Sequence, residues 1–463
     1  MKKLDGLKKR LKGKIVDDPL IVQLYTREAS GIEGSAWAVA YPESVSDLSI
    51  IASWAYKEEV PLYPQGASSD LVGAAVPDGG VVVSFERMRR VREVSVVDSL
   101  VVSDPGVRLG DLNSILAEKG YMFPVDPGSV RVATVGGAVN SGAGGMRGAK
   151  YGTMRDWTLA LTLVLVDEGG SVLRVGCRTL KCRQGYDLVR LIVGSEGTLA
   201  LVGEAVLRIT PLPEATATVA GFFPDFEGVA ESVRLVRESA IQPLAMEFLD
   251  RDTAVKASIA AGVSIDVKGH MVILSVETCS EARERMLDKL ESLMVQAGAV
   301  GVVKARSREM EEELYRVRRH LFPAQAQEAA RTGGKTINYI EDIAVPPSRL
   351  SEALNAIYEI SKAHSVDVHV GGHLADGNLH PGVSIRLDDP VQKDRVSKWY
   401  KDIMRMAVRL GGTVSSEHGI GLVKKDGLRE ELEALGSAKA LDIMKAIKKA
   451  WDPKGLLNPG KVV

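Results

Sequence analysis

Hydrophobic and polar positions along the first half of the chain change between the periods of strands and helices, and these changes predict the local structure. Residues 37–40 and 60–64 have the extended pattern of strands, and residues 46–58 between them have a helical pattern with Ser46 or Asp47 near its N-cap. Two further strand-like stretches follow at 159–166 and 172–175. The first half of the chain therefore predicts a mixed domain of strands and helices.

The pattern changes after Pro211-Leu212-Pro213, from which point strands and helices alternate to residue 410. Strands are expected at 216–223, 244–249, 271–277, 300–304, 337–345 and 366–371, and helices at 226–239, 281–297, 348–363 and 391–410. This order fits two rounds of a split β-α-β plan, in which helices cover one side of an antiparallel sheet. The tail from Lys424 is expected to be helical until residues 452–455.

Residues 371–380, Gly-Gly-His-Leu-Ala-Asp-Gly-Asn-Leu-His, combine a turn signal with two of the seven histidines. Asp-Gly and Asn tolerate the positive φ of tight turns, so a hairpin is expected here with residues 375–378 as its loop. In that register His373 faces His380, about 5 Å away at Cβ. Two neutral imidazoles at this separation suit a divalent metal, and Glu417 is the expected third ligand. Such a set accepts Zn, Mn or Fe. The alternative is that both histidines are ordinary polar residues beside a turn.

Three glycine-rich segments occur in the first half of the chain, at residues 65–73, 133–145 and 193–199. The first follows a predicted strand, a place where backbone amides can surround a phosphate. The second has five glycines in 13 residues, which implies close approach of its backbone to a ligand or to another strand. None spells G-x-G-x-x-G, so a Rossmann dinucleotide site is not indicated.

Composition narrows the class of protein. The chain has 463 residues, of which 45% are hydrophobic and 26% charged, and this is typical of a soluble globular protein with two to four domains. A net charge of -1 argues against nucleic acid as a partner. The three cysteines, Cys177, Cys182 and Cys279, lack metal-type spacing and predict a reducing compartment. Without a transmembrane run or a signal-peptide core, a cytoplasmic location is expected.

Residues 1–14 carry seven basic residues and place Leu4, Leu7 and Leu11 on one helical face. This pattern is typical of a solvated first helix. It also fits peripheral contact with an anionic membrane on the inner face, and both interpretations stay open.

Taken together, nine segments resemble the FAD-linked oxidases related to the glycolate oxidase large subunit and FAD-dependent D-lactate dehydrogenase, whose fold is of the vanillyl-alcohol-oxidase type. The segments are 64–77, 124–129, 133–145, 151–153, 185–188, 194–199, 372–380, 416–421 and 458–461. The resemblance covers nearly the whole chain and implies an α+β fold with a two-part FAD-binding domain and a cap domain. The implied domains are an N-terminal helical segment (1–35), an FAD-binding domain (36–213), a cap and substrate domain (214–423) and a C-terminal segment that returns to the FAD domain (424–463).

The same resemblance implies where FAD binds. The implied contacts are Pro64, Gly66, Ala67, Ser68, Ser69, Pro127, Gly128, Ser129, Thr134, Gly136, Gly137, Asn140, Ser141, Gly144, Tyr151, Gly152, Glu196, Gly197 and Asn458. One loop departs from the family, which usually has a proline, a basic residue and three glycines where this chain has Pro-Gln-Gly-Ala-Ser-Ser-Asp at 64–70. Alanine and serine are strained at positive φ and keep phosphate further away, so weaker FAD binding is expected.

Attachment of FAD is expected to be non-covalent. Related enzymes often tether FAD through a histidine of the flavin domain, whereas the first histidine here is His270. A cysteinyl link at Cys177 or Cys182 is left open.

Oxidation of an alcohol by flavin needs an acceptor for hydride, a base for the hydroxyl proton and an anchor for the substrate. The expected general base is His418, and the alternative is that its ring forms a hydrogen bond that holds the loop. Arg318 takes the place of the family's carboxylate-binding arginine, and the alternatives are that Arg319 has this role or that Arg318 forms a surface ion pair. Asn378 either binds substrate or steadies the turn. Some relatives carry a substrate lysine where this chain has Ile340, which favours lactate or glycolate over hydroxyglutarate.

The expected function is therefore metal-assisted oxidation of a D-2-hydroxy acid, with a quinone or an electron-carrier protein as acceptor. Three alternatives stay open: a flavin-binding accessory subunit that passes electrons, a D-2-hydroxyglutarate-type dehydrogenase, and a non-redox lyase or synthase of the same fold. A homodimer is also compatible with the sequence.

Overall fold

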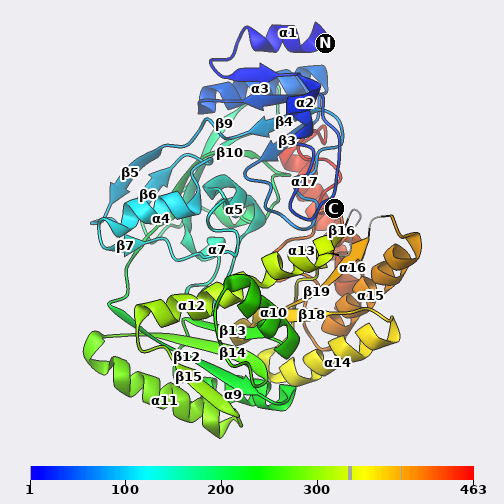
Figure 1. The fold of residues 1–463 in the computed structure, drawn as a ribbon. Coiled ribbons are helices and arrows are strands. Elements are labelled where there is room, and N and C mark those ends of the chain that lie inside the picture. Colours follow the sequence, from blue (N-terminus) through cyan, green and yellow to red (C-terminus); the bar gives the residue numbers. More distant parts are fainter. Residues whose placement is uncertain (1, 332–335, 387) are drawn as a thin grey trace. The chain divides into compact units, whose positions relative to one another are not determined.

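The structure is a computed structural model that describes residues 2–331, 336–386 and 388–463. The chain divides into two compact units (Figure 1). The first unit comprises residues 1–144, 152–212 and 417–463, and the second comprises 145–151 and 213–416. The division at 212/213 lies one residue from the expected domain boundary. The returning segment begins at Glu417 rather than at 424, and the short piece 145–151 belongs to the second unit.

The first unit contains two main sheets with a helix between them. The smaller sheet has the strand order β1-β2-β4-β3, formed by β1 (Lys14–Val16), β2 (Ala38–Tyr41), β4 (Val81–Ser84) and β3 (Leu62–Gln65). The larger, antiparallel sheet has the order β5-β6-β10-β8-β9, formed by β5 (Val91–Ser95), β6 (Leu100–Ser103), β10 (Leu201–Arg208), β8 (Thr158–Val164) and β9 (Val172–Gly176).

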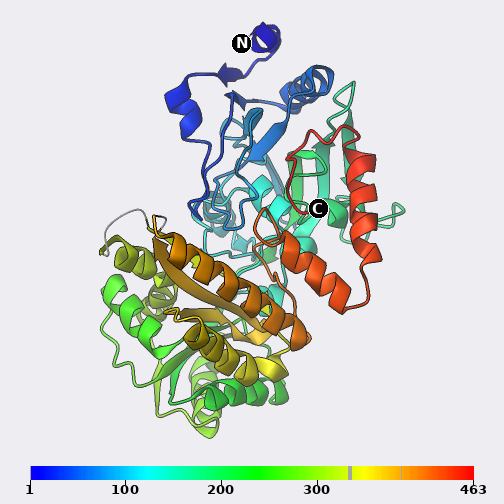
Figure 2. The same cartoon turned by 90° about the vertical axis from the view of Figure 1, so that its right-hand side faces the viewer.

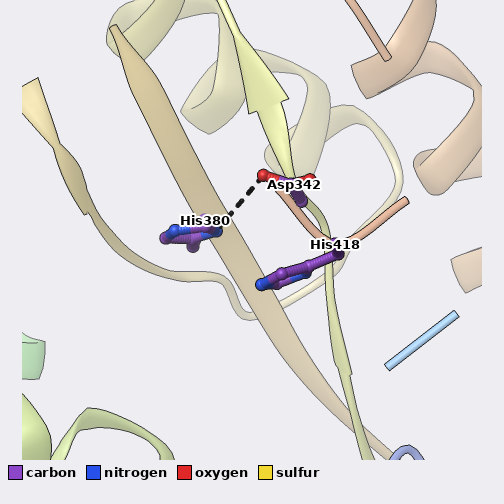
Figure 3. Close-up of side chains that lie close together, drawn as sticks. All are labelled: Asp342, His380 and His418. Carbon is purple, nitrogen blue, oxygen red and sulfur yellow. Dashed lines mark ion pairs between the residues drawn. The ribbon is translucent and has the colours of Figure 1, made fainter. Parts of the chain in front are cut away.

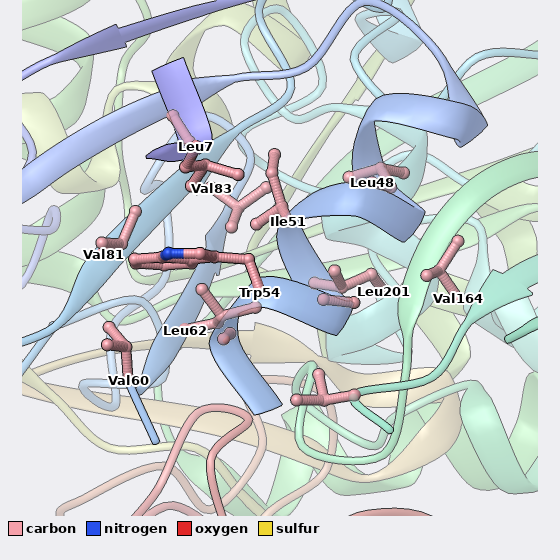
Figure 4. Close-up of a cluster of buried hydrophobic side chains, with 14 of the residues drawn as sticks. Leu7, Leu48, Ile51, Trp54, Val60, Leu62, Val81, Val83, Val164 and Leu201 are labelled. Atoms are coloured by element: carbon pink, nitrogen blue, oxygen red, sulfur yellow. The ribbon is translucent and has the colours of Figure 1, made fainter. Parts of the chain in front are cut away.

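Helix α3 (Val45–Glu58) carries the core of the first unit. Its buried Ile51 and Trp54 belong to a cluster that also contains Val83 of the smaller sheet and Leu201 of the larger one (Figure 4). The predicted N-cap near Ser46 or Asp47 is wrong by two to three residues, because the hydroxyl of Ser44 accepts the Asp47 amide and caps the helix. The Asp47 carboxylate instead accepts the amides of residues 12, 13 and 43.

The N-terminal helix α1 (Lys2–Lys8) packs against this same core. Leu4 and Leu7 are buried in the α3 cluster, and Leu7 is fully buried. The apolar side of α1 is therefore covered by protein. The exposed leucines of this region lie on the next helix, α2 (Pro19–Gln23), and at its end, where Leu20 and Leu24 are 76% and 77% exposed.

The C-terminal segment belongs to the first unit through α16 (Lys425–Ala434) and α17 (Lys439–Trp451), which are red in Figure 2. Lys448 on α17 donates to the carbonyl of Thr198 at 2.7 Å and to that of Leu457 at 2.7 Å. Asn458 then donates to the carbonyls of Ala74 and Glu196. These bonds hold the tail against the glycine-rich loops of the same unit.

The second unit is built on one antiparallel sheet with the order β15-β12-β14-β13-β18-β19-β16, in which β17 also pairs with β19. The strands are β12 (Ala215–Phe223), β13 (Ala245–Leu249), β14 (His270–Thr278), β15 (Gly301–Lys304), β16 (Thr336–Ile340), β17 (Ile343–Ala344), β18 (His369–His373) and β19 (Asn378–Arg386). The expected single strand over 337–345 is interrupted at Glu341 and Asp342, both fully buried.

Helices cover both faces of this sheet, so the prediction of helices on one side is wrong. Gly221 of β12 faces α11 (Arg283–Gln296), because a Cβ atom there would lie 3.1 Å from Met294. The adjacent Phe222 faces the other way and clusters with Leu314 of α12 (Arg308–Arg319). The helices on the second face were not predicted, because three of them were not recognised in the sequence: α10 (Arg251–Ala261), α12 and α13 (Leu321–Arg331).

Cys177 and Cys182 form a disulfide in the loop after β9, with their Cα atoms 5.7 Å apart. The expectation of a reducing compartment rested on an odd number of cysteines without metal-type spacing, and this pairing of two of them does not support it. The pairing also leaves neither sulfur as a thiol for a cysteinyl flavin link. Within the described residues, no helix is both long and apolar enough to cross a membrane.

Glu28 is buried beneath the loop that contains residues 66–75. Its carboxyl group accepts the Gly73 amide at 2.5 Å, the Ser30 hydroxyl at 2.8 Å and the Ala75 amide at 3.3 Å. Asp70 accepts the amides of Val72 and Ala74 in the same loop. Burial, helped by the neighbouring Asp70 carboxylate, raises the pKa of Glu28 to about 8.

Replacing Leu7 tests whether α1 is part of the folded core. Leu7→Ala is expected to lower the free energy of unfolding by about 2–5 kcal/mol, because it removes a fully buried side chain. Leu20→Ala, at a position 76% exposed, is the control and is expected to change it by less than about 0.5 kcal/mol. Urea unfolding of the full chain measures both, and equal values would contradict the packing of α1.

Replacing Glu28 tests the raised pKa. The folded chain keeps the Glu28 proton up to about pH 8, whereas the unfolded chain releases it near the ordinary value of 4.5. The protonated Glu28 side chain therefore stabilises the folded chain fully below pH 4.5, and this stabilisation is lost as the pH rises through about 8. Between about pH 5 and about pH 8.5, urea midpoints of the wild type should therefore fall more than those of Glu28→Gln. Glu33→Gln, at an exposed carboxylate, should behave as the wild type; a Glu28→Gln slope equal to the wild-type slope would refute the assignment.

Candidate active site

The hairpin of the second unit differs in register from the prediction. Its loop is 374–377, with Gly377 at φ 79°, so His373 pairs with Asn378, and His380 pairs with Gly371. The predicted direct pairing of the two histidines is therefore wrong. Both still lie on one face, because they are offset by two residues and side chains alternate along a strand. Their ring centroids are 5.2 Å apart, and both rings are buried.

A buried carboxylate on the neighbouring strand holds His373. Glu247 lies opposite His373 in the β13–β18 pairing and is fully buried. Its two oxygens lie 2.8 Å and 2.9 Å from the Nδ1 atom of His373. Its Oε2 atom also forms an ion pair with Arg318, 2.7 Å from Nε. The sequence analysis missed Glu247, although a lone acidic residue inside the apolar stretch 244–249 was a usable signal.

A second buried carboxylate, Asp342, lies at the interruption between β16 and β17, near His380 (Figure 3). Its Oδ1 atom is 3.9 Å from the Nδ1 atom of His380. Asp342 also accepts the Asn378 side-chain amide at 2.8 Å, the Ser415 hydroxyl at 3.1 Å and the Ser416 backbone amide at 2.9 Å. Asn378 donates further to the carbonyl of Ile343, so its amide steadies the hairpin turn.

Glu417 and His418 begin the returning segment of the first unit. They follow Ser416 directly in the chain, and Ser416 is bonded to Asp342 in the second unit. Within the first unit, a Cβ atom at Gly144 would lie 3.0 Å from Oε2 of Glu417, so glycine leaves room for this carboxylate beside the second glycine-rich loop. The Nε2 atom of His418 lies 3.7 Å from Oε1 of Glu417.

Glu196 anchors the residues that follow His418. Its carboxylate accepts the Ile420 amide at 2.6 Å and the Gly421 amide at 2.8 Å. Burial raises its pKa to about 7, against the lowering effect of these two backbone bonds. Glu196 therefore ties the third glycine-rich turn to the returning segment.

The glycine-rich loops of the first unit form a cradle that fits a polar ligand. A Cβ atom at Gly66 would meet the Thr134 hydroxyl at 2.4 Å and Gly137 at 3.5 Å, so these segments are in close contact. Within the described residues, three buried oxygens near them have no hydrogen-bond partner: Oδ1 of Asn140, Oγ of Ser195 and Oδ1 of Asn458. Unsatisfied buried oxygens can accept donors from a ligand. The set therefore fits a ligand with several hydrogen-bond donors, and FAD is such a ligand.

Other implied FAD residues lie in three further places. Pro64 contacts Gly197, where a Cβ atom would lie 2.6 Å from the proline ring. Residues 127–129 form a turn whose carbonyls accept the amides of residues 130, 132 and 133. Tyr151 belongs to the second unit, where its hydroxyl donates to Glu277 at 2.6 Å, and burial together with Glu277 raises its pKa.

Comparison with known proteins gives matches along nearly the whole chain. Residues 212–462 match the family described as FAD linked oxidases, C-terminal domain, and residues 36–176 match an FAD binding domain family. Glycolate oxidase subunit GlcD of Bacillus subtilis is 33% identical over 427 residues, which cover 92% of this chain and 88% of that protein. D-lactate dehydrogenase of Archaeoglobus fulgidus is 32% identical over 435 residues, which cover 92% and 91%.

Among solved structures, 4-ethylphenol oxidase from Gulosibacter chungangensis superposes with a TM-score of 0.78 at 17% identity, covering 99% of this chain and 96% of that one. This likeness shows the fold, which is of the vanillyl-alcohol-oxidase type. The family matches and the two relatives show more: this chain belongs to the FAD-linked oxidases and is an FAD-linked oxidoreductase related to glycolate oxidase and D-lactate dehydrogenase.

Proposed function

We propose that this protein oxidises a D-2-hydroxy acid of lactate or glycolate size to the 2-oxo acid, with non-covalently bound FAD and a divalent metal. The observation that carries the proposal is the pair of buried imidazoles, His373 and His380, on one face of the second unit. The activities named for the two relatives, a glycolate oxidase subunit and a D-lactate dehydrogenase, support the substrate class.

The donor set suits a metal. The Nδ1 atom of His373 is engaged by Glu247, which leaves Nε2 as the ligand atom. His380 offers a second imidazole on the same face, and Glu417, one residue beyond the Asp342-bound Ser416, offers a carboxylate. This His₂Glu set accepts Zn, Mn or Fe. A bound divalent metal supplies positive charge that makes the substrate hydroxyl a stronger acid.

The chain's own groups then bind the acid and move its proton. Arg318, whose charge is paired with that of Glu247, holds the substrate carboxylate with its guanidinium. His418 accepts the hydroxyl proton as general base. FAD, when bound, supplies the acceptor for the hydride from the carbinol carbon. Asn378 acts on the turn, because its amide is bonded to Asp342 and Ile343.

The proposed size of the substrate is supported by Ile340, which stands where some relatives carry a lysine for a second acidic group. This favours a lactate- or glycolate-sized acid over hydroxyglutarate. Electrons then leave to a quinone or a carrier protein. A second candidate function is a flavin-binding subunit of a larger dehydrogenase, and it is supported by the Bacillus subtilis relative, which is a glycolate oxidase subunit.

Bleaching of the flavin under anaerobic conditions tests the proposal. D-Lactate should bleach the FAD of the wild type, whereas a chelator or His380→Ala should slow bleaching at least about 100-fold, because the hydroxyl then keeps its ordinary acidity. The matched control is His364→Ala, a histidine of the second unit that is paired with Asp402 at 2.8 Å.

Two outcomes would count against this account. Bleaching that neither the chelator nor His380→Ala slows would rule out the metal. No bleaching by any 2-hydroxy acid in FAD-loaded protein would leave the flavin-binding subunit as the better assignment.

A further inference from the structure

We propose that Glu247 is the positioning residue of the site, which fixes the tautomer of His373 and the orientation of Arg318 with one buried charge. This inference rests on the proposed function, in which His373 binds a metal and Arg318 binds the substrate carboxylate. It assigns a role to a residue that belongs to neither group of ligands.

The burial of Glu247 requires charged or polar partners. The residue lies on β13, an interior strand of the sheet between β14 and β18, and its side chain is fully buried. A carboxylate without water is costly unless donors surround it. Glu247 meets this need with His373 from the adjacent strand and Arg318 from the last turn of α12.

The contact with His373 determines where the imidazole proton lies. Both carboxylate oxygens of Glu247 are within 2.9 Å of Nδ1, and a carboxylate only accepts hydrogen bonds. The proton of the neutral ring is therefore on Nδ1, and the lone pair on Nε2 is free of that contact and fixed in direction. A carboxylate behind a ligating histidine also raises the basicity of the ligand nitrogen.

The contact with Arg318 gives the same carboxylate a second task. Arg318 has a side chain only 10% exposed, and its Nε atom lies 2.7 Å from Oε2 of Glu247. The contact is a charge pair, because Nε of Arg318 makes no hydrogen bond within the described residues. A charge pair at this distance determines where the planar guanidinium lies, and a guanidinium binds a carboxylate with two of its nitrogens. Glu247 therefore contacts both His373, which is proposed to bind the metal, and Arg318, which is proposed to bind the substrate carboxylate.

The second histidine is held differently, which makes the role of Glu247 specific. Asp342 is 3.9 Å from Nδ1 of His380, beyond hydrogen-bond distance, and its oxygens accept bonds from Asn378, Ser415 and Ser416. Loss of Glu247 should therefore affect His373 and Arg318, and it should leave the His380 side intact.

The first measurement is the tautomer of His373 in metal-free, full-length protein. With ¹⁵N-labelled histidine only seven rings give signals, and His373→Ala identifies the one of interest. We expect the Nδ1–H form in the wild type, which is the opposite of the form that a free imidazole favours. An Nε2–H ring in the folded wild type would overturn the proposal, and this readout depends on no variant of Glu247.

The second measurement is Zn²⁺ affinity, by competition with a chelator, in Glu247→Gln. Gln keeps the shape of the side chain and an acceptor for Nδ1 but removes the charge, so affinity is expected to fall about 10–100-fold. The KM for D-lactate should rise as well, because Arg318 loses its partner. The matched control is Glu311→Gln on the same helix as Arg318, where the carboxylate only accepts the Thr216 hydroxyl.

The two proposals fail in distinguishable ways. Zn²⁺ binding by Glu247→Gln as tight as by Glu311→Gln would overturn the role of Glu247, even if D-lactate bleaches the flavin. An Nδ1–H ring and weakened Zn²⁺ binding, without bleaching by any 2-hydroxy acid, would support the role of Glu247 and refute the proposed reaction.

Discussion

The need to pair one buried negative charge organises the second unit. Glu247 is enclosed within an antiparallel sheet whose two faces are covered by helices, so water does not compensate its charge. The sheet supplies His373 from the neighbouring strand, and α12 supplies Arg318. Three elements far apart in sequence are thereby brought into a single arrangement around one carboxylate.

A comparable constraint acts in the first unit through Glu196. This buried carboxylate binds the amides of residues 420 and 421, so the segment that carries Glu417 and His418 is fixed to a glycine-rich turn. Asn458 adds a bond to the carbonyl of Glu196. The last 47 residues therefore help to shape the FAD-binding unit. The absence of a side chain at Gly144 leaves the space that the Glu417 carboxylate uses.

Local patterns predicted much of the fold. The strands and helices expected between 216 and 304, and the hairpin at 371–380, occur near their expected positions, because alternation and turn residues act within a few residues. The hairpin loop begins one residue earlier than predicted, so His373 pairs with Asn378 and not with His380, a shift of two residues. Both histidines stay on one face because an even shift keeps each side chain on its side of the sheet.

What the sequence did not reveal depends on long-range contacts. The partner of His373 is 126 residues away, and only the strand order β13-β18 brings Glu247 to it. Helix α12, which carries Arg318, was not predicted. Most of its residues are charged, so the few that are buried do not give a clear apolar pattern. The Cys177–Cys182 disulfide joins two residues that are five positions apart, but their spacing was compared only with that of metal-binding motifs.

The central claim is that His373 and His380 present their Nε2 atoms to one metal in an FAD-linked oxidase. Crystals grown with FAD and Zn²⁺, measured on both sides of the zinc absorption edge, test it most directly. The account predicts one anomalous peak about 2.0–2.1 Å from both Nε2 atoms, with Nδ1 of His373 still bonded to Glu247. A peak elsewhere, no peak in zinc-loaded crystals, or ligation through Nδ1 of His373 would contradict it.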